Sequence, residues 1–207
     1  MRRNANTTIA GDKMVLVPYR KEHVRLYHAW MEDEQLREAT ASERLTLQQE
    51  YEMQEAWARD DDKCTFIILD KARPGDAATG SHGAMAGDVN LFFNDPEEPS
   101  TSEIEIMVAD GRSRRKGIAR EALDAMMRYA VTSLDVAKFR AKIGVDNAPS
   151  LALFDKLGFA RVSYSEIFRE VALECAMDER SRAALRDRTQ HLVYGTYDGD
   201  GGRIEAE

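Results

Sequence analysis

The sequence predicts one mixed α/β domain, and three observations support that fold class. Strand-like and helix-like patterns alternate along the chain, with short connections and without an internal repeat. The 207 residues include 43% hydrophobic residues, which is enough to bury a full core. Two strand-like runs, residues 84–93 and 103–109, flank the turn-rich stretch NDPEEPSTS and predict a central antiparallel hairpin.

Local signals define most of the expected elements. In chain order these are a strand at 13–19, a helix at 22–31, a helix after Thr46, strands at 64–70, 84–93 and 103–109, a helix at 117–133, a strand at 138–143, a helix at 147–157, and strands around 159–165 and 168–177. Pro18 closes the first strand, and Thr46 with Gln49 forms a capping-box signal. Residues 72–83 are rich in Gly, Pro, Ser and Asp, so we expect a mobile loop there.

Composition excludes several classes of function. A formal net charge of -8 and a pI near 5.2 argue against non-specific nucleic-acid binding, which needs a broad positive field. No apolar run approaches the roughly 20 residues of a membrane span, and the start MRRNANTT lacks the apolar core of a signal peptide. We therefore expect a cytosolic or nuclear location. Cys64 and Cys175 lie in apolar runs without metal-ligand spacing, which predicts buried reduced thiols and no metal site.

A dense basic cluster stands out against this acidic background. The stretch GRSRRKGIAREAL, residues 111–123, joins a predicted strand to the start of a helix. It carries five cations around one glycine, namely Arg112, Arg114, Arg115, Lys116 and Arg120 around Gly117. A helix start already carries about half a positive charge, so each cation is unfavourable there by roughly 0.3–1 kcal/mol unless an anion neutralises it.

The cluster therefore predicts a bound anion, and a polyphosphate fits best. Gly117 lets the backbone approach a phosphate closely, and the N–H groups of the helix start can surround its oxygens. The spacing matches neither a Walker loop nor the G-x-G-x-x-G dinucleotide pattern. The alternative is a solvated basic turn without a ligand.

The context of the cluster resembles a known family. EIEIMVADGRSRRKGIAREAL, residues 103–123, resembles the signature segment of the GNAT superfamily of acetyl-coenzyme A-dependent N-acetyltransferases. KFRAKIGVDNAPSLALFDKLGFARV, residues 138–162, is similar to the downstream motif of that superfamily. VLVPYRKEHVRLYHAWM, TASERLTLQQEYEMQ and DKCTFIILD are similar to the N-acetyltransferase 9-like branch, so the resemblance covers most of residues 1–175.

The resemblance implies a particular architecture. A GNAT fold has a central, mostly antiparallel mixed sheet that splays between two central strands and is flanked by helices. We expect this domain over residues 1–176, followed by a C-terminal helix at 177–194. The ending DGDGGRIEAE has the composition of a disordered segment, which predicts a tail at 195–207.

The resemblance also implies a site for acetyl-CoA. The pyrophosphate of coenzyme A is expected on the backbone amides of residues 114–119, and the pantetheine arm and thioester on backbone groups near Met107 and Ala109. Asn147 matches a position that contacts the cofactor arm, although a helix cap three residues before Ser150 explains it equally well. The implied cofactor-binding residues are Met107, Val108, Ala109, Arg114, Arg115, Lys116, Gly117, Ile118, Ala119, Asn147, Ser150 and Phe154.

The expected chemistry is direct attack of a neutral amine on the thioester, with a base to take its proton. Glu103 and Glu105 are the candidate bases, and Glu103 matches the glutamate of lysine-acetylating relatives; the alternative is the polar edge of a half-exposed strand. At pH 7.4, neutralising a lysine costs about 4 kcal/mol and an α-amino group about 0.5 kcal/mol, so a strong base matters mainly for lysine. Many relatives carry a tyrosine acid for the leaving thiolate where this chain has Phe154, so water or another group must protonate the sulfur, or turnover is slow.

The acceptor is expected to be a protein amine, either an N-terminal α-amino group or a lysine. Asp88, Asn90 and residues 40–43 are candidate acceptor contacts, with turn and cap chemistry as the alternative. The resemblance to the N-acetyltransferase 9-like branch implies tubulin or microtubules as a partner. A second hypothesis is a weakly active or inactive GNAT-fold interaction protein that keeps the cofactor pocket for stability, and Phe154 favours it.

Overall fold

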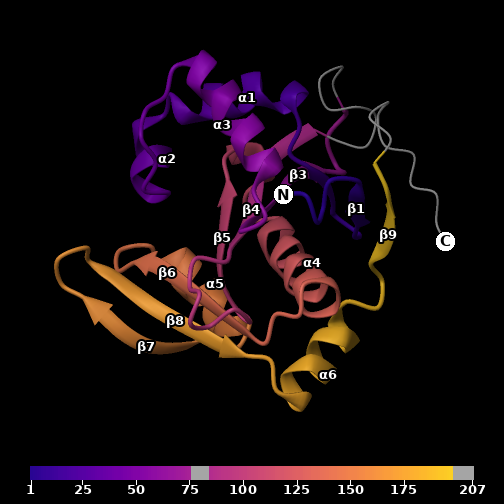
Figure 1. Cartoon of the computed structure of the whole chain (residues 1–207), viewed down its shortest axis with the longest axis vertical. Coiled ribbons are helices and arrows are strands. Elements are labelled where there is room, and N and C mark those ends of the chain that lie inside the picture. The colour runs from indigo at the N-terminus through magenta and orange to yellow at the C-terminus, as the bar shows by residue number, and fades with distance from the viewer. Residues whose placement is uncertain (76–83, 198–207) are drawn as a thin grey trace.

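One nine-stranded sheet organises the computed structural model, which describes residues 1–75 and 84–197 (Figure 1). The strand order is β7-β8-β6-β5-β4-β3-β2-β1-β9. The strands are β1 Thr7–Ala10, β2 Met14–Pro18, β3 Lys63–Asp70, β4 Ala84–Phe92, β5 Thr101–Val108, β6 Lys138–Gly144, β7 Ala160–Ser165, β8 Glu170–Ala176 and β9 Val193–Thr196. The helices are α1 Val24–Met31, α2 Glu34–Ala39, α3 Leu47–Arg59, α4 Ile118–Ser133, α5 Ala148–Lys156 and α6 Glu179–Arg188, with 3₁₀ turns η1 Lys21–His23 and η2 Gly111–Ser113.

The helices cover the two faces of the sheet separately. On one face, α4 and α5 pack over side chains such as Leu91 and Ile104 in the larger core cluster. On the opposite face, α1–α3 pack over Met107 and Ile67 in a second cluster. Because side chains alternate along a strand, Glu105 of β5 points to the same face as Met107. This is the face on which α1–α3 pack.

The sheet opens between β5 and β6. These strands are parallel and pair at three positions, Thr101↔Lys138, Ser102↔Phe139 and Glu103↔Arg140. Both strands are fully described, and β5 continues to Val108 while β6 continues to Gly144 without further pairing between them. The other strand pairs are antiparallel, so the expected mostly antiparallel sheet with a central splay is confirmed.

Gly87 fixes how closely β4 approaches β5 beside the splay. A Cβ at this position would lie 1.8 Å from the carbonyl oxygen of Met107, which no side chain tolerates. Gly87 pairs with Val108, so the glycine allows the far end of β5 to lie tightly against β4. The end of β5 is therefore held on the β4 side, while its β6 side stays open.

Several sequence predictions are confirmed, and others need correction. The capping box of Thr46 and Gln49 forms at the start of α3, and both cysteines are buried and free. The expected helix at 22–31 divides into η1 and α1, because the chain tightens into one 3₁₀ turn after Arg20. The elements β1, α2 and β9 are not predicted from the sequence, because they are too short to show a clear period.

The folded part of the chain extends beyond residue 194, where the sequence predicts that it ends. The prediction of a helix at 177–194 is wrong beyond Arg188, because α6 ends there and β9 begins at Val193. The prediction of a disordered tail from residue 195 is wrong for Gly195 and Thr196, which end β9 and pair with β1. Tyr197 is also buried, and its hydroxyl donates to Glu22 at 3.0 Å. The helix α6 docks on α4 through buried Leu185 and an ion pair between Arg188 and Asp124 at 2.6 Å.

Two expectations fall partly on residues outside the described ranges. These are the mobile loop, for its residues 76–83, and the disordered tail, for its residues 198–207. Within the described ranges, none of the helices combines the length and the apolar character that a membrane span requires.

Candidate active site

The basic loop, residues 110–117, connects the end of β5 to the start of α4. Asp110 begins it by accepting a hydrogen bond from the Arg112 N–H at 2.9 Å. Arg115 and Gly117 both adopt left-handed backbone angles, with φ of 59° and 85°. A non-glycine residue in that region is unfavourable, and such residues often mark functional sites. The loop delivers the chain into α4, whose first N–H groups have no partner within the helix.

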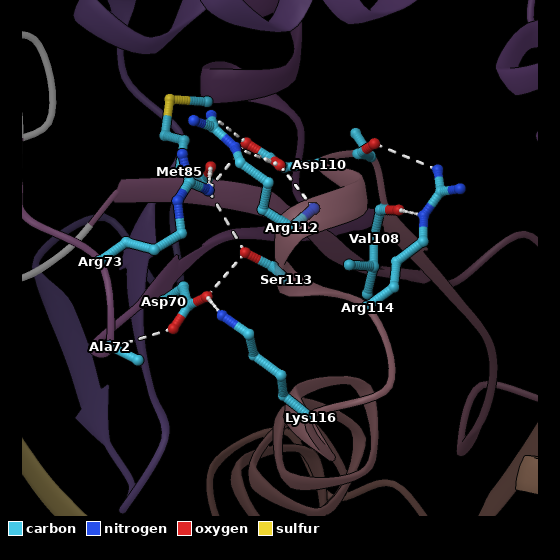
Figure 2. A network of polar contacts seen from close by, with 11 residues as sticks. Asp70, Ala72, Arg73, Met85, Val108, Asp110, Arg112, Ser113, Arg114 and Lys116 are labelled. Carbon is cyan, nitrogen blue, oxygen red and sulfur yellow. Dashed lines mark hydrogen bonds and ion pairs between the residues drawn. The ribbon is translucent and has the colours of Figure 1, made fainter.

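The cations of the basic loop are largely matched by protein groups. Figure 2 shows Asp70 accepting from Ser113 and Lys116, and Asp110 beside Arg112 and Arg73. The Lys116 Nζ lies 3.0 Å from Asp70, and the Arg112 Nη2 lies 2.7 Å from Asp110. The hydrogen bond from Arg112 lowers the pKa of Asp110 to about 2. Carboxylates of the protein therefore neutralise part of the charge of Lys116 and Arg112.

Arg114 contacts the strand that precedes the loop. Its guanidinium donates to the carbonyl oxygens of Val108 at 2.8 Å and Ala109 at 3.1 Å. These carbonyls belong to the backbone stretch at which the pantetheine arm is expected. Arg115, by contrast, makes no hydrogen bond or ion pair with any residue that the structure describes, and its side chain is exposed.

The two candidate bases on β5 have different surroundings. Glu103 forms an ion pair with Lys142 of β6, with 2.8 Å between Oε2 and Nζ. Glu105 lies opposite Asn90 of β4 and keeps access to water. Desolvation by the surrounding protein and repulsion from Glu103 together raise the pKa of Glu105 to about 7. Glu105 is thus poised to exchange a proton near neutral pH.

Glu105 belongs to a polar cluster, which we define as the buried residues Tyr27, Lys63, Asp88 and Asn90 together with the exposed Glu105. Asp88 accepts hydrogen bonds from the Tyr27 hydroxyl at 3.2 Å and the Asn90 amide at 2.8 Å. Burial raises the pKa of Asp88. Asp88 and Asn90 are internal to a central strand, so the alternative of turn and cap chemistry is wrong for both.

Lys63 is the member of the polar cluster that the sequence analysis missed. Its Nζ lies 3.4 Å from the centroid of the Trp57 ring and 3.8 Å from that of Phe92, which is a cation–π sandwich. Burial lowers the pKa of Lys63 to about 8, although Asp88 and Glu105 oppose that effect. One signal was available, because a lysine directly before a mostly apolar strand-like run is expected to bury its stem.

The remaining predicted residues have different structural roles. Asn147 caps α5 by accepting from the Ser150 N–H at 3.2 Å, as the helix-cap interpretation expects. Phe154 is buried in the core, where its ring packs edge-on to Phe159, so its side chain contributes to core packing. Residues 40–43 follow α2 at the surface.

One group of possible metal ligands occurs among the described residues. Asp12, Glu121 and His191 place ligand atoms within 4.8 Å of one another. The Glu121 carboxylate, however, accepts the backbone N–H groups of Asp12, Lys13 and Met14 at 2.9, 2.9 and 3.2 Å. These hydrogen bonds make Glu121 a tie between α4 and the β1–β2 hairpin.

Comparison with known proteins identifies what this arrangement resembles. Residues 13–160 match the family described as Acetyltransferase (GNAT) domain. The chain is 52% identical to the N-acetyltransferase 9-like protein of Nematostella vectensis, over 84% of this chain and 88% of that protein. It is 49% identical to the Alpha/beta-tubulin-N-acetyltransferase 9 of Mus musculus, over 95% of this chain and 82% of that protein.

Solved structures show the same fold at low sequence identity. Mycobacterium smegmatis RimJ in complex with CoA-disulfide superposes with a TM-score of 0.70 at 15% identity, covering 92% of this chain and 97% of that chain. Spermidine N-acetyltransferase from Vibrio cholerae in complex with CoA and spermine gives a TM-score of 0.67 at 16% identity, covering 79% of this chain and 95% of that chain. Both solved proteins hold a form of coenzyme A.

Proposed function

Because the chain belongs to the GNAT family of N-acetyltransferases, we propose that its acceptor is a protein amine and that Glu105 takes the proton of that amine. The acyl donor of this family is acetyl-CoA, and the protein is an acyltransferase. The observation that carries the proposal is the position of Glu105, next to the splay and with a pKa raised to about 7.

The splay and the basic loop fit acetyl-CoA. Past Glu103, β5 no longer pairs with β6, so backbone groups near Met107 and Ala109 that face the β6 side can bond a pantetheine arm. The loop offers the N–H groups of a helix start to the pyrophosphate, with exposed Arg115 as the side chain best placed to add charge. Arg114 must leave the carbonyls of Val108 and Ala109 if it is to reach a phosphate.

The residues around Glu105 define its part in the reaction. The amine nitrogen attacks the thioester carbon, the carbon–sulfur bond breaks, the sulfur leaves as a thiolate, and the amine proton passes to Glu105 directly or through a water. The ion pair with Lys142 occupies Glu103, which leaves Glu105 as the free carboxylate on this face. Phe154 is buried and has no proton to give, so we propose that water protonates the thiolate.

The pKa of Glu105 favours an N-terminal α-amino group over a lysine. An α-amino group has a pKa of about 7.7–8.0, so its proton moves to Glu105 at a cost of about 1 kcal/mol. A lysine of pKa about 10.4 would require about 4–5 kcal/mol for the same transfer. We propose tubulin as the acceptor protein, because relatives 49% identical are named for it, and this would place the reaction in the cytoplasm.

Two measurements, made one after the other, test this proposal. Calorimetric titration with acetyl-CoA should show micromolar binding, weaker for dephospho-coenzyme A. Mass spectrometry should then show acetylation of a tubulin N-terminal peptide, at least about 100-fold faster than that of the same peptide with a blocked α-amino group and one lysine. Equal transfer to the lysine would refute the α-amino assignment. Absence of acetyl-CoA binding would instead support the interaction-protein hypothesis.

A further inference from the structure

Asp70 connects the basic loop to a strand that is not its neighbour. Asp70 is the last residue of β3, and β4 separates that strand from β5. Its Oδ2 accepts the Ser113 hydroxyl at 2.7 Å and the Lys116 Nζ at 3.0 Å, and its Oδ1 accepts the Ala72 N–H at 2.9 Å (Figure 2). The residue is 1% exposed, so the partners of this carboxylate are groups of the protein itself.

We propose that Asp70 is a positioning residue for acetyl-CoA, which holds the basic loop in the shape that receives the pyrophosphate. The inference rests on the proposed placement of coenzyme A on that loop. Asp70 itself cannot be a ligand, because it is buried and carries the same sign of charge as a phosphate. It acts through Ser113 near the start of the loop and Lys116 near its end.

The loop needs such an anchor for two reasons. First, Arg115 and Gly117 lie on either side of Lys116 in left-handed conformations, which an unanchored loop would not keep. Second, Arg114, Arg115 and Lys116 repel one another at a helix start that is already positive. A loop that must be ordered during binding gives a weaker complex than one that is already ordered.

The state of the carboxylate supports this role. Burial alone would raise the pKa of Asp70, but hydrogen bonds from Ser113, Lys116 and the Ala72 N–H outweigh burial and hold the pKa below its usual value. Asp70 is therefore ionised at neutral pH, and its hydrogen bonds to the loop are charge-assisted. An amide in its place would keep the shape and lose the charge.

The test replaces Asp70→Asn and titrates the full chain with acetyl-CoA. We expect the dissociation constant to rise about 10-fold or more, because the loop loses its anchor. In steady-state assays, the KM for acetyl-CoA should rise while kcat and the acceptor KM stay unchanged. The matched control is Asp124→Asn, which removes another buried carboxylate, paired with Arg188 at 2.6 Å, and should leave acetyl-CoA affinity unchanged.

A second variant keeps the proposal falsifiable if Asp70→Asn fails to fold. Ser113→Ala removes one hydroxyl from the same contact and should weaken acetyl-CoA binding about 3-fold or more. In a chain that also carries Lys116→Met and Ser113→Ala, Asp70→Asn should add little further loss, because its two loop partners are gone.

The outcomes separate this inference from the proposed function. Wild-type protein that does not bind acetyl-CoA overturns both. Wild-type binding with unchanged or tighter binding by Asp70→Asn and Ser113→Ala overturns only the inference, because Asp70 would then compete with the phosphate for Lys116. Equal weakening by Asp124→Asn would also overturn it, since general loss of stability would explain the effect.

Discussion

The basic loop and the polar cluster both contain carboxylates held by neighbours, but their protons respond in opposite ways. In the loop, a hydrogen bond from Arg112 lowers the pKa of Asp110 to about 2. The pKa of Asp70, which contacts the loop from the end of β3, is also lowered. In the polar cluster, desolvation raises the pKa of Glu105 to about 7 and raises that of Asp88, while burial lowers the pKa of Lys63 to about 8.

This contrast shows how one sheet supports two kinds of chemistry. Groups that only hold a shape or attract a charge work best when their protonation is fixed, and the loop provides such groups. Groups that exchange protons must titrate near the working pH, and the polar cluster provides those. The structural cause is the surroundings, because Asp70 and Asp110 pair directly with cations. Around Glu105, desolvation and repulsion from Glu103 outweigh the attraction of Lys63 and Lys142.

The largest effect is expected from removing Glu105, the carboxylate that exchanges a proton near neutral pH. Glu105→Gln should lower kcat about 100-fold or more, because the amine loses its base. Acetyl-CoA affinity should stay unchanged, since the basic loop is untouched. Single-turnover assays with the acceptor peptide, beside calorimetry, measure both quantities. The control Glu103→Gln should lower kcat much less, and the reverse order of the two effects would make Glu103 the base.

A smaller effect is expected from the cation that faces Glu105. Lys63→Met keeps the apolar stem but removes its charge, so the pKa of Glu105 should rise further and activity below pH 7 should fall about 3- to 10-fold. The measurement is the pH profile of kcat/KM, whose acidic limb should move to higher pH. Glu103, Asp88 and Lys142 also face Glu105, and Lys142→Met should move the limb less. An unmoved limb in Lys63→Met would remove Lys63 from the control of the base.

On the loop side, the exposed cation should matter for binding alone. Arg115→Gln should weaken acetyl-CoA binding about 5-fold, because the pyrophosphate loses one charge-assisted contact. Thermal stability should stay within about 0.5 kcal/mol, since Arg115 has no partner among the described residues. The binding loss should shrink at high salt. Arg169→Gln, at another exposed left-handed arginine, is the control and should leave binding unchanged.

The smallest effect concerns stability, and its sign differs between the two regions. Because the pKa of Asp110 is lowered, its ionised carboxylate stabilises the fold at pH values above 3.8. This contribution is lost as the pH falls from 3.8 through about 2. Asp110→Asn should therefore cost up to about 1 kcal/mol at pH 7, and this cost should shrink as the pH falls through about 2. The raised pKa of Glu105 acts oppositely, since its contribution is present below pH 4.5 and lost as the pH rises through about 7.

Thermal melts of both variants across pH would measure this difference. Glu105→Gln should melt at a higher temperature than wild type at pH 8, and Asp110→Asn at a lower one. The same sign for both variants at pH 8 would show that the two regions do not differ in the way proposed.

The fold was largely predictable, because its signals are local. The charged and apolar alternation around Ile104, the capping box of Thr46 and the glycine before α4 each identify an element from a few neighbouring residues. The family resemblance supplied the splay, which depends on how far β5 and β6 pair and which no local pattern shows.

The partners in the candidate site were much less predictable. Asp70 meets Lys116 across 46 positions of sequence, and Tyr27 meets Asp88 across 61. Such contacts depend on strand order, which the sequence pattern leaves open. For the same reason the sequence ranked Glu103 and Glu105 as equals, since only the ion pair with Lys142 distinguishes them.

The last strand of the sheet has a consequence for how the chain is made. β9 pairs with β1, so the edge of a strand near residue 10 is covered by residues near 195. A ribosome delivers β1 long before β9, so one edge of β1 stays unpaired while the residues between them emerge. The domain therefore closes its sheet only after nearly all of the described residues have left the ribosome.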